Sequence, residues 1–276
     1  NSGSNSITGE DFKDKNTGQD EILELKKVFF NKDFHFQTRI LVQFDTDEIN
    51  SFITSSNISP DYKTNLRLWE TKGTSGLSET YTIAAYPLSE SWDEGIGKEG
   101  DVPKTVDGCS WAYSKNNQGV EVKWNAYSSS ISSSIDESDN TINTNLTFTS
   151  SFIDSVGISE GSYIQADETT QVFSAESPDL NMDITTLANK WFGGVNNNYG
   201  IMLRLSGSRE TSSTSFEDLK FFSRQTNTIY SPKIELKWDD HLPATGSNTG
   251  SLTTLDLSGN RENYLYPIHF REAYKE

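Results

Sequence analysis

Apolar and polar residues alternate with a period of two along much of this chain, which is the pattern of β-strands that bury one face. In the clearest run, residues 232–238, the apolar side chains of Ile234, Leu236 and Trp238 alternate with charged ones. Such alternation predicts an antiparallel sheet with one face in the core and one face in water. Further runs of this kind are residues 36–44, 66–70, 81–87, 120–124, 145–150, 200–205 and 219–223.

Two segments have the spacing of short helices instead. The first is residues 45–53, and the second opens near Asp183 and contains apolar residues about one helical turn apart. Asp183 is placed to cap the second helix, and Gly193 with Gly194 to end it. The apolar positions of the second helix are Ile184, Leu187, Ala188 and Trp191.

The polar stretches between the runs are rich in Ser, Asn, Thr and Gly, as loops and linkers are. The fold predicted from these patterns is all-β, an antiparallel β-sandwich of the jelly-roll kind with one or two short helical turns. We expect the sandwich to occupy residues 1–240 and residues 241–276 to form a linker and C-terminal extension, or the start of a further domain. The abrupt end of the chain favours a segment of something longer.

The net charge of −17, from 40 acidic and 23 basic residues, narrows the choice of partners. Affinity for nucleic acids and anionic membranes comes chiefly from Lys and Arg, so direct binding to either is not expected. A large acidic excess commonly serves solubility. No secretory leader and no apolar stretch of membrane-spanning length is apparent in the sequence.

Few compact motifs of common catalytic sites are apparent in the sequence. The histidines are His35, His241 and His269, and none has the spacing of a metal site. The phosphate-loop motif GxxxxGK[ST] is absent; residues 157–161 match GxSxG and residues 95–100 match GxGxxG, but neither match follows a predicted strand and opens a predicted helix, as those sites require. Cys109 has no second cysteine with which to form a disulfide. We therefore predict that the chain is not an enzyme and has no catalytic residues.

Paired carboxylates are the remaining candidates for chemistry, because a glycosidase needs only two acids across a cleft. Neighbouring acids on a strand point to opposite faces, so solvated loop acids are the simpler interpretation. A calcium ion held by dispersed carboxylates stays open as a cofactor, with its ligands unassigned. The acids concerned are Asp93, Glu94, Asp136, Glu137, Asp139, Asp239 and Asp240.

Tryptophan can serve as a stacking platform for sugars when its indole face is exposed. Trp69 and Trp238 lie within alternating runs and Trp191 ends a helical pattern, so these three are predicted to be core residues. Trp92 and Trp111 stand beside Gly and Asp in loop-like sequence. They are the candidates for a glycan platform.

Several segments, in order along the chain, resemble the DNRLRE, or disaggregatase-related, β-sandwich family, whose jelly-roll-like modules are related to carbohydrate-binding modules. An early strand has the sequence Arg-Ile-Leu-Val-Gln-Phe-Asp, and a later segment reads Ser-Glu-Ser-Trp-Asp-Glu-Gly. A turn resembles the Asp-Val-Thr…Trp pattern of that family. The segments that carry the resemblance are residues 39–45, 66–69, 86–95, 183–191, 198–203, 222–224 and 230–236.

The version in this chain looks most like structural proteins of T4-like marine tailed phages. That likeness is carried by Ser-Trp-Asp-Glu-Gly-Ile-Gly-Lys at 91–98, Asp-Gly-Cys-Ser-Trp at 107–111 and Lys-Trp-Asp-Asp at 237–240. The family has no shared catalytic residues to carry over. Independently of the family, Arg39 and Arg224 are expected to pair with acids at the margin of the sheet.

The first functional hypothesis is a virion structural protein, a capsid, neck or tail component that contacts other virion proteins in an oligomeric assembly. Its partner-binding candidates are the aromatic residues of the C-terminal extension, because aromatic side chains anchor interfaces. The alternative is a carbohydrate-binding module for a cell-surface polysaccharide, and a polysaccharide-cleaving enzyme ranks last. The aromatic candidates are Tyr264, Tyr266, Phe270 and Tyr274.

Overall fold

The computed structural model describes residues 4–5, 10–11, 14–30, 34–55, 62–71, 81–124, 162–173, 179–206, 209 and 217–238. The chain divides into two compact units, Asn1–Trp238 and Asp239–Glu276. Every described residue belongs to the first unit. Among the described residues, no helix is long and apolar enough to cross a membrane.

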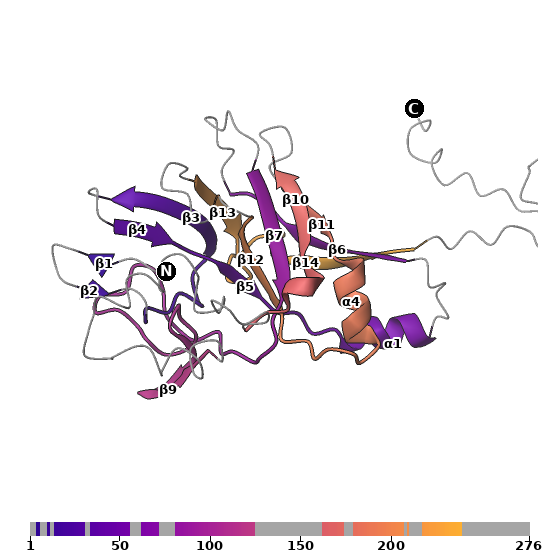
Figure 1. The fold of residues 1–276 in the computed structure, drawn as a ribbon, viewed down its shortest axis with the longest axis horizontal. Helices are drawn as coiled ribbons and strands as arrows, with labels where there is room; N and C mark the ends of the chain where they lie inside the picture. Colours follow the sequence, from indigo (N-terminus) through magenta and orange to yellow (C-terminus); the bar gives the residue numbers. More distant parts are fainter. Residues whose placement is uncertain are drawn as a thin grey trace, which may run out of the picture. The chain divides into compact units, whose positions relative to one another are not determined.

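Antiparallel strands make up most of this unit, and the strands β10, β7 and β12 run side by side in Figure 1. A four-stranded sheet has the order β10 (Thr169–Phe173), β7 (Tyr81–Pro87), β12 (Ile201–Leu205) and β5 (Ile40–Val42). A second sheet consists of β11 (Leu180–Asp183), β6 (Lys63–Leu68) and β14 (Lys233–Lys237). A third consists of β13 (Glu217–Phe222), β3 (Ile22–Phe30) and β4 (Phe34–Gln37).

Two small hairpins complete the strands, β1 (Ser4–Asn5) with β2 (Glu10–Asp11) and β8 (Tyr113–Asn117) with β9 (Val120–Lys123). An isolated bridge between Glu70 and Phe221 connects the second sheet to the third. One hydrophobic core takes side chains from all three larger sheets, including Leu25, Leu68 and Ile83. The all-β, sandwich-like prediction is therefore confirmed.

The four-stranded sheet is covered on both faces, which corrects the expectation that one face is in water. On β7, Ala85 belongs to the principal core, whereas its neighbour Ala84 belongs to a second core. The second core also contains Tyr86, Trp124 and Met202. Because successive residues of a strand point to opposite faces, burial of both alanines requires a layer of loops on the far side of the sheet.

Both predicted helices are present, with shifted ends. The first, α1, spans Asp47–Ser55, and the second, α4, spans Thr185–Phe192 and ends before Gly193, as expected. A short 3-10 helix, η1, covers Gln165–Asp167. The prediction that Asp183 caps α4 is wrong, because the N-cap is Ile184. Asp183 lies one residue earlier and accepts hydrogen bonds from the backbone N and the hydroxyl of Thr185 at 3.0 and 2.6 Å. Side chains of α4 close one end of the principal core.

The strand predictions differ from the structure in informative ways. The run at 36–44 is two strands, because Thr38 breaks the pairing and donates its hydroxyl to the carbonyl of Glu24 at 2.6 Å. The strand β3 went unpredicted because Lys27 occupies an inward position, where it is 2% exposed and donates to the carbonyl of Arg209. The strands β8, β10 and β11 also went unpredicted. The run at 145–150 lies outside the described residues.

Candidate functional site

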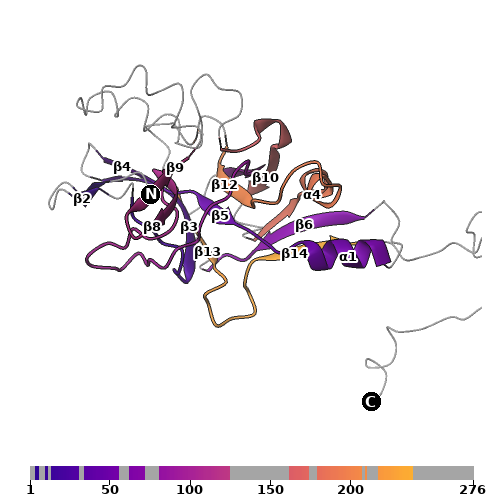
Figure 2. The ribbon, with the colours of Figure 1, turned by 90° about the horizontal axis from the view of Figure 1, so that it is seen from below.

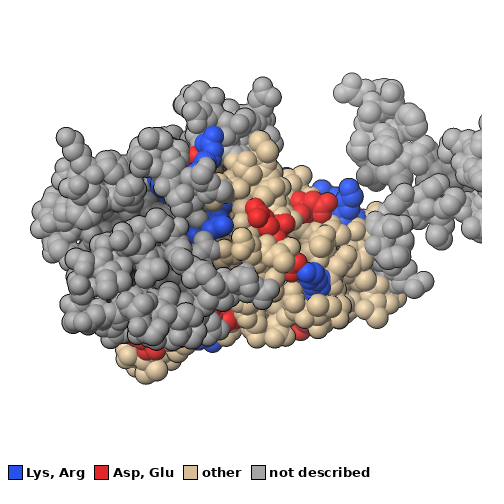
Figure 3. Space-filling model, in the orientation of Figure 1, with Lys and Arg blue, Asp and Glu red and all other residues tan. Residues whose placement is uncertain are grey.

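A groove of about 760 Å³ lies beside β5, between the segment that precedes β3 and the loops that cover the four-stranded sheet. Its apolar lining comes from β3, β5 and the loop tryptophans, and its polar lining from residues 15–20, 43–47 and 223–225. The described charged groups on the face in Figure 3 lie in small clusters among uncharged residues. Its lining residues therefore make the groove a mixed apolar and polar surface, as many ligand sites are.

One buried side chain, Asn16, holds the segment before β3 against these loops. It is 1% exposed, and its Nδ2 donates to the carbonyls of Glu94 and Cys109 at 2.8 and 2.7 Å. Its Oδ1 accepts from the backbone N of Gly18 and Gly97 at 3.1 and 2.9 Å. The amide therefore ties three stretches of chain together at one wall of the groove.

Glycines surround Asn16 because larger residues would collide with it. A Cβ on Gly97 would lie 2.4 Å from the carbonyl oxygen of Asn16. Gly95 and Gly108 have φ angles of +80° and +107°, in the region that favours glycine, and a Cβ on Gly108 would lie 2.3 Å from Cα of Gly95. The motif Asp-Glu-Gly-Ile-Gly thus serves the packing of this wall.

Trp92 and Trp111, the two predicted platform residues, both line the groove. Trp92 is partly buried against the second core, and its Nε1 donates to the carbonyl of Tyr199 at 2.7 Å, which fixes the orientation of the ring. Trp111 is only 6% exposed and has the guanidinium of Arg39 5.3 Å from its ring centroid. The exposure that a stacking platform requires is therefore not found at Trp111.

Carboxylates outnumber cations along the groove. Arg224 pairs with Glu94, as predicted for this arginine. The Nζ of Lys15 donates to the carbonyl of Glu99 at 2.5 Å and lies 3.9 Å from the carboxylate of the same residue. The acids of the lining are Asp20, Glu24, Asp45, Asp47, Glu94 and Glu99, and the cations are Lys15, Arg39 and Arg224.

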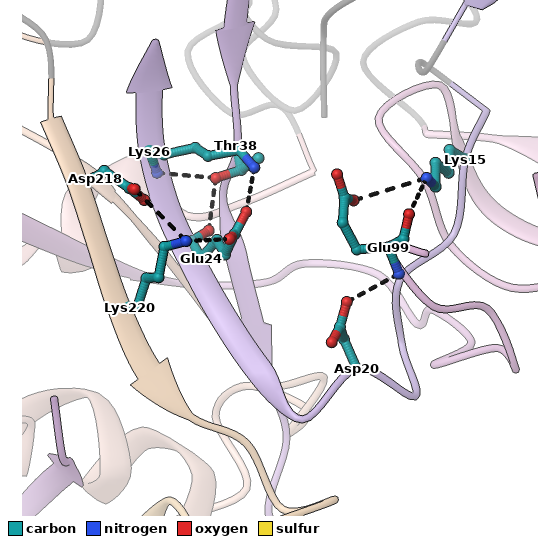
Figure 4. A network of polar contacts seen from close by, with 8 residues as sticks. All are labelled: Lys15, Asp20, Glu24, Lys26, Thr38, Glu99, Asp218 and Lys220. Atoms are coloured by element: carbon teal, nitrogen blue, oxygen red, sulfur yellow. Dashed lines mark hydrogen bonds and ion pairs between the residues drawn. The ribbon is translucent and has the colours of Figure 1, made fainter. Parts of the chain in front are cut away.

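Glu24 is the centre of a polar network on β3 and β13 (Figure 4). Lys26 and Lys220 both pair with its carboxylate, Lys220 at 3.0 Å. Burial by itself raises the pKa of Glu24, but the hydrogen bonds and charges of the two lysines bring it below its ordinary value. The hydrogen bond to Glu24 raises the pKa of Lys220 in turn. This network links β3 to β13 at the edge of the groove.

Cys109 lies on the loop beside the groove and packs against the second core. Burial raises the pKa of its thiol to about 12. A thiol with so high a pKa stays protonated at neutral pH and is a poor nucleophile.

A second candidate surface, which sequence reasoning missed, lies where β6, β13 and β14 meet. We call it the aromatic cluster and define it as Trp69, Phe222 and Tyr230. The ring of Tyr230 lies 5.9 Å from that of Phe222, nearly parallel to it, and 6.0 Å from that of Trp69. Tyr230 is 45% exposed and its neighbour Ile229 is 76% exposed.

Two of the tryptophans predicted to be core residues are at the surface instead. Trp69 is only partly buried, and the cations of Arg67 and Lys233 lie 5.5 and 5.2 Å from its ring centroid. Trp238 is 43% exposed and packs edge-on against Phe52 of α1. Trp69 shares the outer face of Arg67 rather than the inner face of Leu68, and Trp238 lies past the end of β14. Trp191 is buried, as predicted.

The other predicted residues are not brought into either surface by the described structure. Tyr264, Tyr266, Phe270 and Tyr274 lie outside the described residues, as do His241, His269 and the acids at 136, 137, 139, 239 and 240. Within the described part of the chain, no group of three or more His, Cys, Asp or Glu side chains could hold a metal ion. Calcium therefore has no assigned ligands.

Comparison with known proteins returned no matching family model, no matching curated protein and no matching solved structure. The resemblance to the DNRLRE family stays a prediction from the sequence motifs.

Proposed function

We propose that this chain is a non-enzymatic structural component of a tailed-phage virion that acts through contacts with other virion proteins. The observation that carries the proposal is the aromatic cluster, together with exposed Ile229, at the ends of β6 and β13 and in the turn before β14. Aromatic side chains and Arg are enriched at protein interfaces and supply much of their binding energy. The order of the phage-like motifs in the sequence supports the same function.

The cluster has the construction of an interface anchor. Tyr230 stacks on Phe222, and the backbone N of Phe222 donates to the carbonyl of Trp69 at 3.0 Å. Phe222 and Trp69 are thus held by backbone pairing, and Tyr230, in the turn before β14, packs on both rings, so a partner would order few side chains on docking. Rigid aromatic groups with one face in water are favourable contact sites for that reason.

Mass spectrometry of purified particles of the encoding phage is the direct test. We expect peptides of this chain at a fixed copy number per particle. Phages carrying Tyr230→Ala with Ile229→Ser should incorporate several-fold less of the chain, whereas Val172→Ser, which changes an exposed apolar residue of β10 outside the aromatic cluster, should not. Absence of the peptides from particles would overturn the proposal.

A second candidate function, carbohydrate binding, is favoured by one observation: the oriented ring of Trp92 lines a groove rich in polar side chains. Sugars are held by an aromatic face, by hydrogen bonds that their hydroxyls donate to carboxylates, and by hydrogen bonds with amides. Gln43 and Asn198 are amides of the same lining.

Glycan-array binding of the recombinant chain tests this second function. Trp92→Ala should abolish binding to any glycan recognised by the wild type. Trp238→Ala, a tryptophan with 43% exposure outside the groove lining, is the matched control and should bind normally. Equal binding by both variants, or no binding by the wild type, would exclude the groove as a glycan site.

A further inference from the structure

The outer face of β6 and β14 places like charges opposite each other. Lys63 is the cross-strand partner of Lys237, and Arg67 is the partner of Lys233. The three lysines are exposed and Arg67 is partly so. Like charges at directly opposed positions destabilise an antiparallel pair. We call this surface the cationic face and define it as Lys63, Arg67, Lys233 and Lys237. Figure 2 shows β6 and β14 lying side by side.

The charges within the sheet compensate the cationic face only in part. Glu235, opposite Asn65 between the two cation pairs, lies 3.9 Å from Nε of Arg67 and 3.6 Å from Nζ of Lys237. Asp183, at the end of the neighbouring strand β11, is near enough to Lys63 for its pKa to be lowered, chiefly by hydrogen bonds from Thr185 and in smaller part by that lysine. The cations still outnumber these acids.

This arrangement is unexpected in a chain with 40 acidic and 23 basic residues. Because acidic residues are in such excess, the composition of the chain favours an acidic residue opposite each of these cations. Local features that lower the stability of a fold are commonly retained at functional sites. An anionic partner would relieve the repulsion and gain charge-assisted contacts.

The cationic face is continuous with the aromatic cluster. Arg67 and Lys233 both lie over the ring of Trp69, which stands next to Tyr230. The two features therefore form one surface, with an apolar anchor at one end and cations along the strands. Such a combination fits an acidic protein surface better than a purely apolar one.

We propose that the cationic face docks onto an acidic surface of a second copy of this chain. The inference rests on the proposed function and names the partner of its contact surface. A second copy carries a net charge of −17, so acidic groups are in excess on it. At physiological salt the Debye length is about 8 Å, so repulsion between whole molecules is screened while contact pairs persist.

Charge limits the symmetry of the contact. A two-fold axis through the cationic face would bring the two cationic faces together, which repels, and a two-fold contact off that face must bring the cationic and acidic surfaces together twice. A heterologous, head-to-tail contact needs that pairing only once, so we infer that the contact is heterologous; such contacts build closed rings or open filaments. Rings and filaments of identical subunits are assemblies expected of a structural protein that is present in many copies.

Sedimentation velocity of the full chain tests the inference. In about 0.15 M salt, we expect mass to rise with protein concentration above the 30.9 kDa of the monomer. The double variant Lys63→Glu with Lys237→Glu reverses two charges of the cationic face and should weaken association by about tenfold or more. The control Lys98→Glu reverses an exposed cation outside both the cationic face and the groove lining and should leave association within about twofold.

Mixing the reversed variant with the wild-type chain tests the symmetry of the contact. In a head-to-tail contact, the reversed variant still offers its acidic surface to the wild type, so adding it should cap growing assemblies and lower their mean mass. Failure of the variant to interact with the wild type would exclude the heterologous contact. Wild-type chain that stays monomeric at every concentration would overturn the inference.

These outcomes are separable from a failure of the proposed function. Chain found in phage particles but monomeric in solution would refute self-docking and leave the virion function standing. Chain that self-associates through the cationic face but is absent from particles would refute the virion function alone.

Discussion

A single buried amide, Asn16, decides the shape of one wall of the groove. All its hydrogen-bonding capacity is used by backbone groups from three loops, and it is nearly inaccessible to water. Buried polar groups left without partners cost more free energy than their hydrogen bonds contribute when formed. Removal of this side chain therefore affects each loop that it touches.

We predict that Asn16→Ala lowers the free energy of unfolding by about 2 to 4 kcal/mol, because backbone donors and acceptors around it lose their partner. Urea denaturation measures the change. Asn50→Ala, at an exposed position of α1, is the control and should shift stability by less than about 0.5 kcal/mol. Equal effects would show that the Asn16 hydrogen bonds contribute little.

Glu24 gives a pH-dependent prediction. Its pKa is lower in the folded chain than its ordinary value near 4.5, so its ion pairs stabilise the fold above that value. As the pH falls through the lowered folded pKa, the carboxylate is protonated and this stabilisation is lost.

Glu24→Gln should therefore lower the free energy of unfolding by about 1 kcal/mol at pH 7. The difference from the wild type should vanish in acid, once Glu24 is protonated in the folded protein as well. Chemical denaturation of both proteins at a series of pH values measures this. A difference that stays constant with pH would mean that packing, not charge, explains the effect.

At the scale of an element, β7 shows why alternation misled. Ile83, Ala84 and Ala85 are all 0% exposed, since the strand has a core on each face. An antiparallel strand with a solvated face would tolerate a charge at every second position. A strand covered on both faces tolerates none.

We expect Ala84→Glu and Ala85→Glu each to destabilise the fold by about 3 kcal/mol or more, because either change buries an unpaired charge. Val172→Glu, on the neighbouring edge strand at 65% exposure, is the control and should cost less than about 0.5 kcal/mol. Thermal unfolding monitored by circular dichroism compares the three. Tolerance of Ala84→Glu alone would mean that the second core is absent in solution.

At the scale of the whole molecule, the net charge of −17 dominates behaviour in solution. Self-repulsion of a chain far from neutrality destabilises its compact state, and salt screens that repulsion. The ion pairs of the described residues are mostly at the surface, where each contributes little.

Raising sodium chloride from about 0.02 to about 0.5 M should therefore increase the melting temperature by roughly 2 to 4 °C, the change expected for about 1 kcal/mol in a chain of this size. Differential scanning fluorimetry suffices, with equiosmolar sucrose as the control for nonspecific exclusion effects. A melting temperature that falls with salt would mean that the ion pairs outweigh the repulsion.

The sequence by itself determined the elements that obey a simple period. The strands β7 and β12 follow from apolar runs and α4 from its spacing and the glycines after it, because those signals are local. The motif around Trp92 placed that residue on a loop, where the structure also has it.

Tertiary structure alone decided the candidate functional surfaces. The second core, the groove and the aromatic cluster arise where segments far apart in sequence meet, as when Asn16 bonds to Cys109 or Trp69 lies against Tyr230. Periodicity records that a side chain alternates, but not which layer covers each face. It could therefore not place Trp111 inside, Trp238 outside, or Lys63 and Arg67 of β6 opposite the lysines of β14.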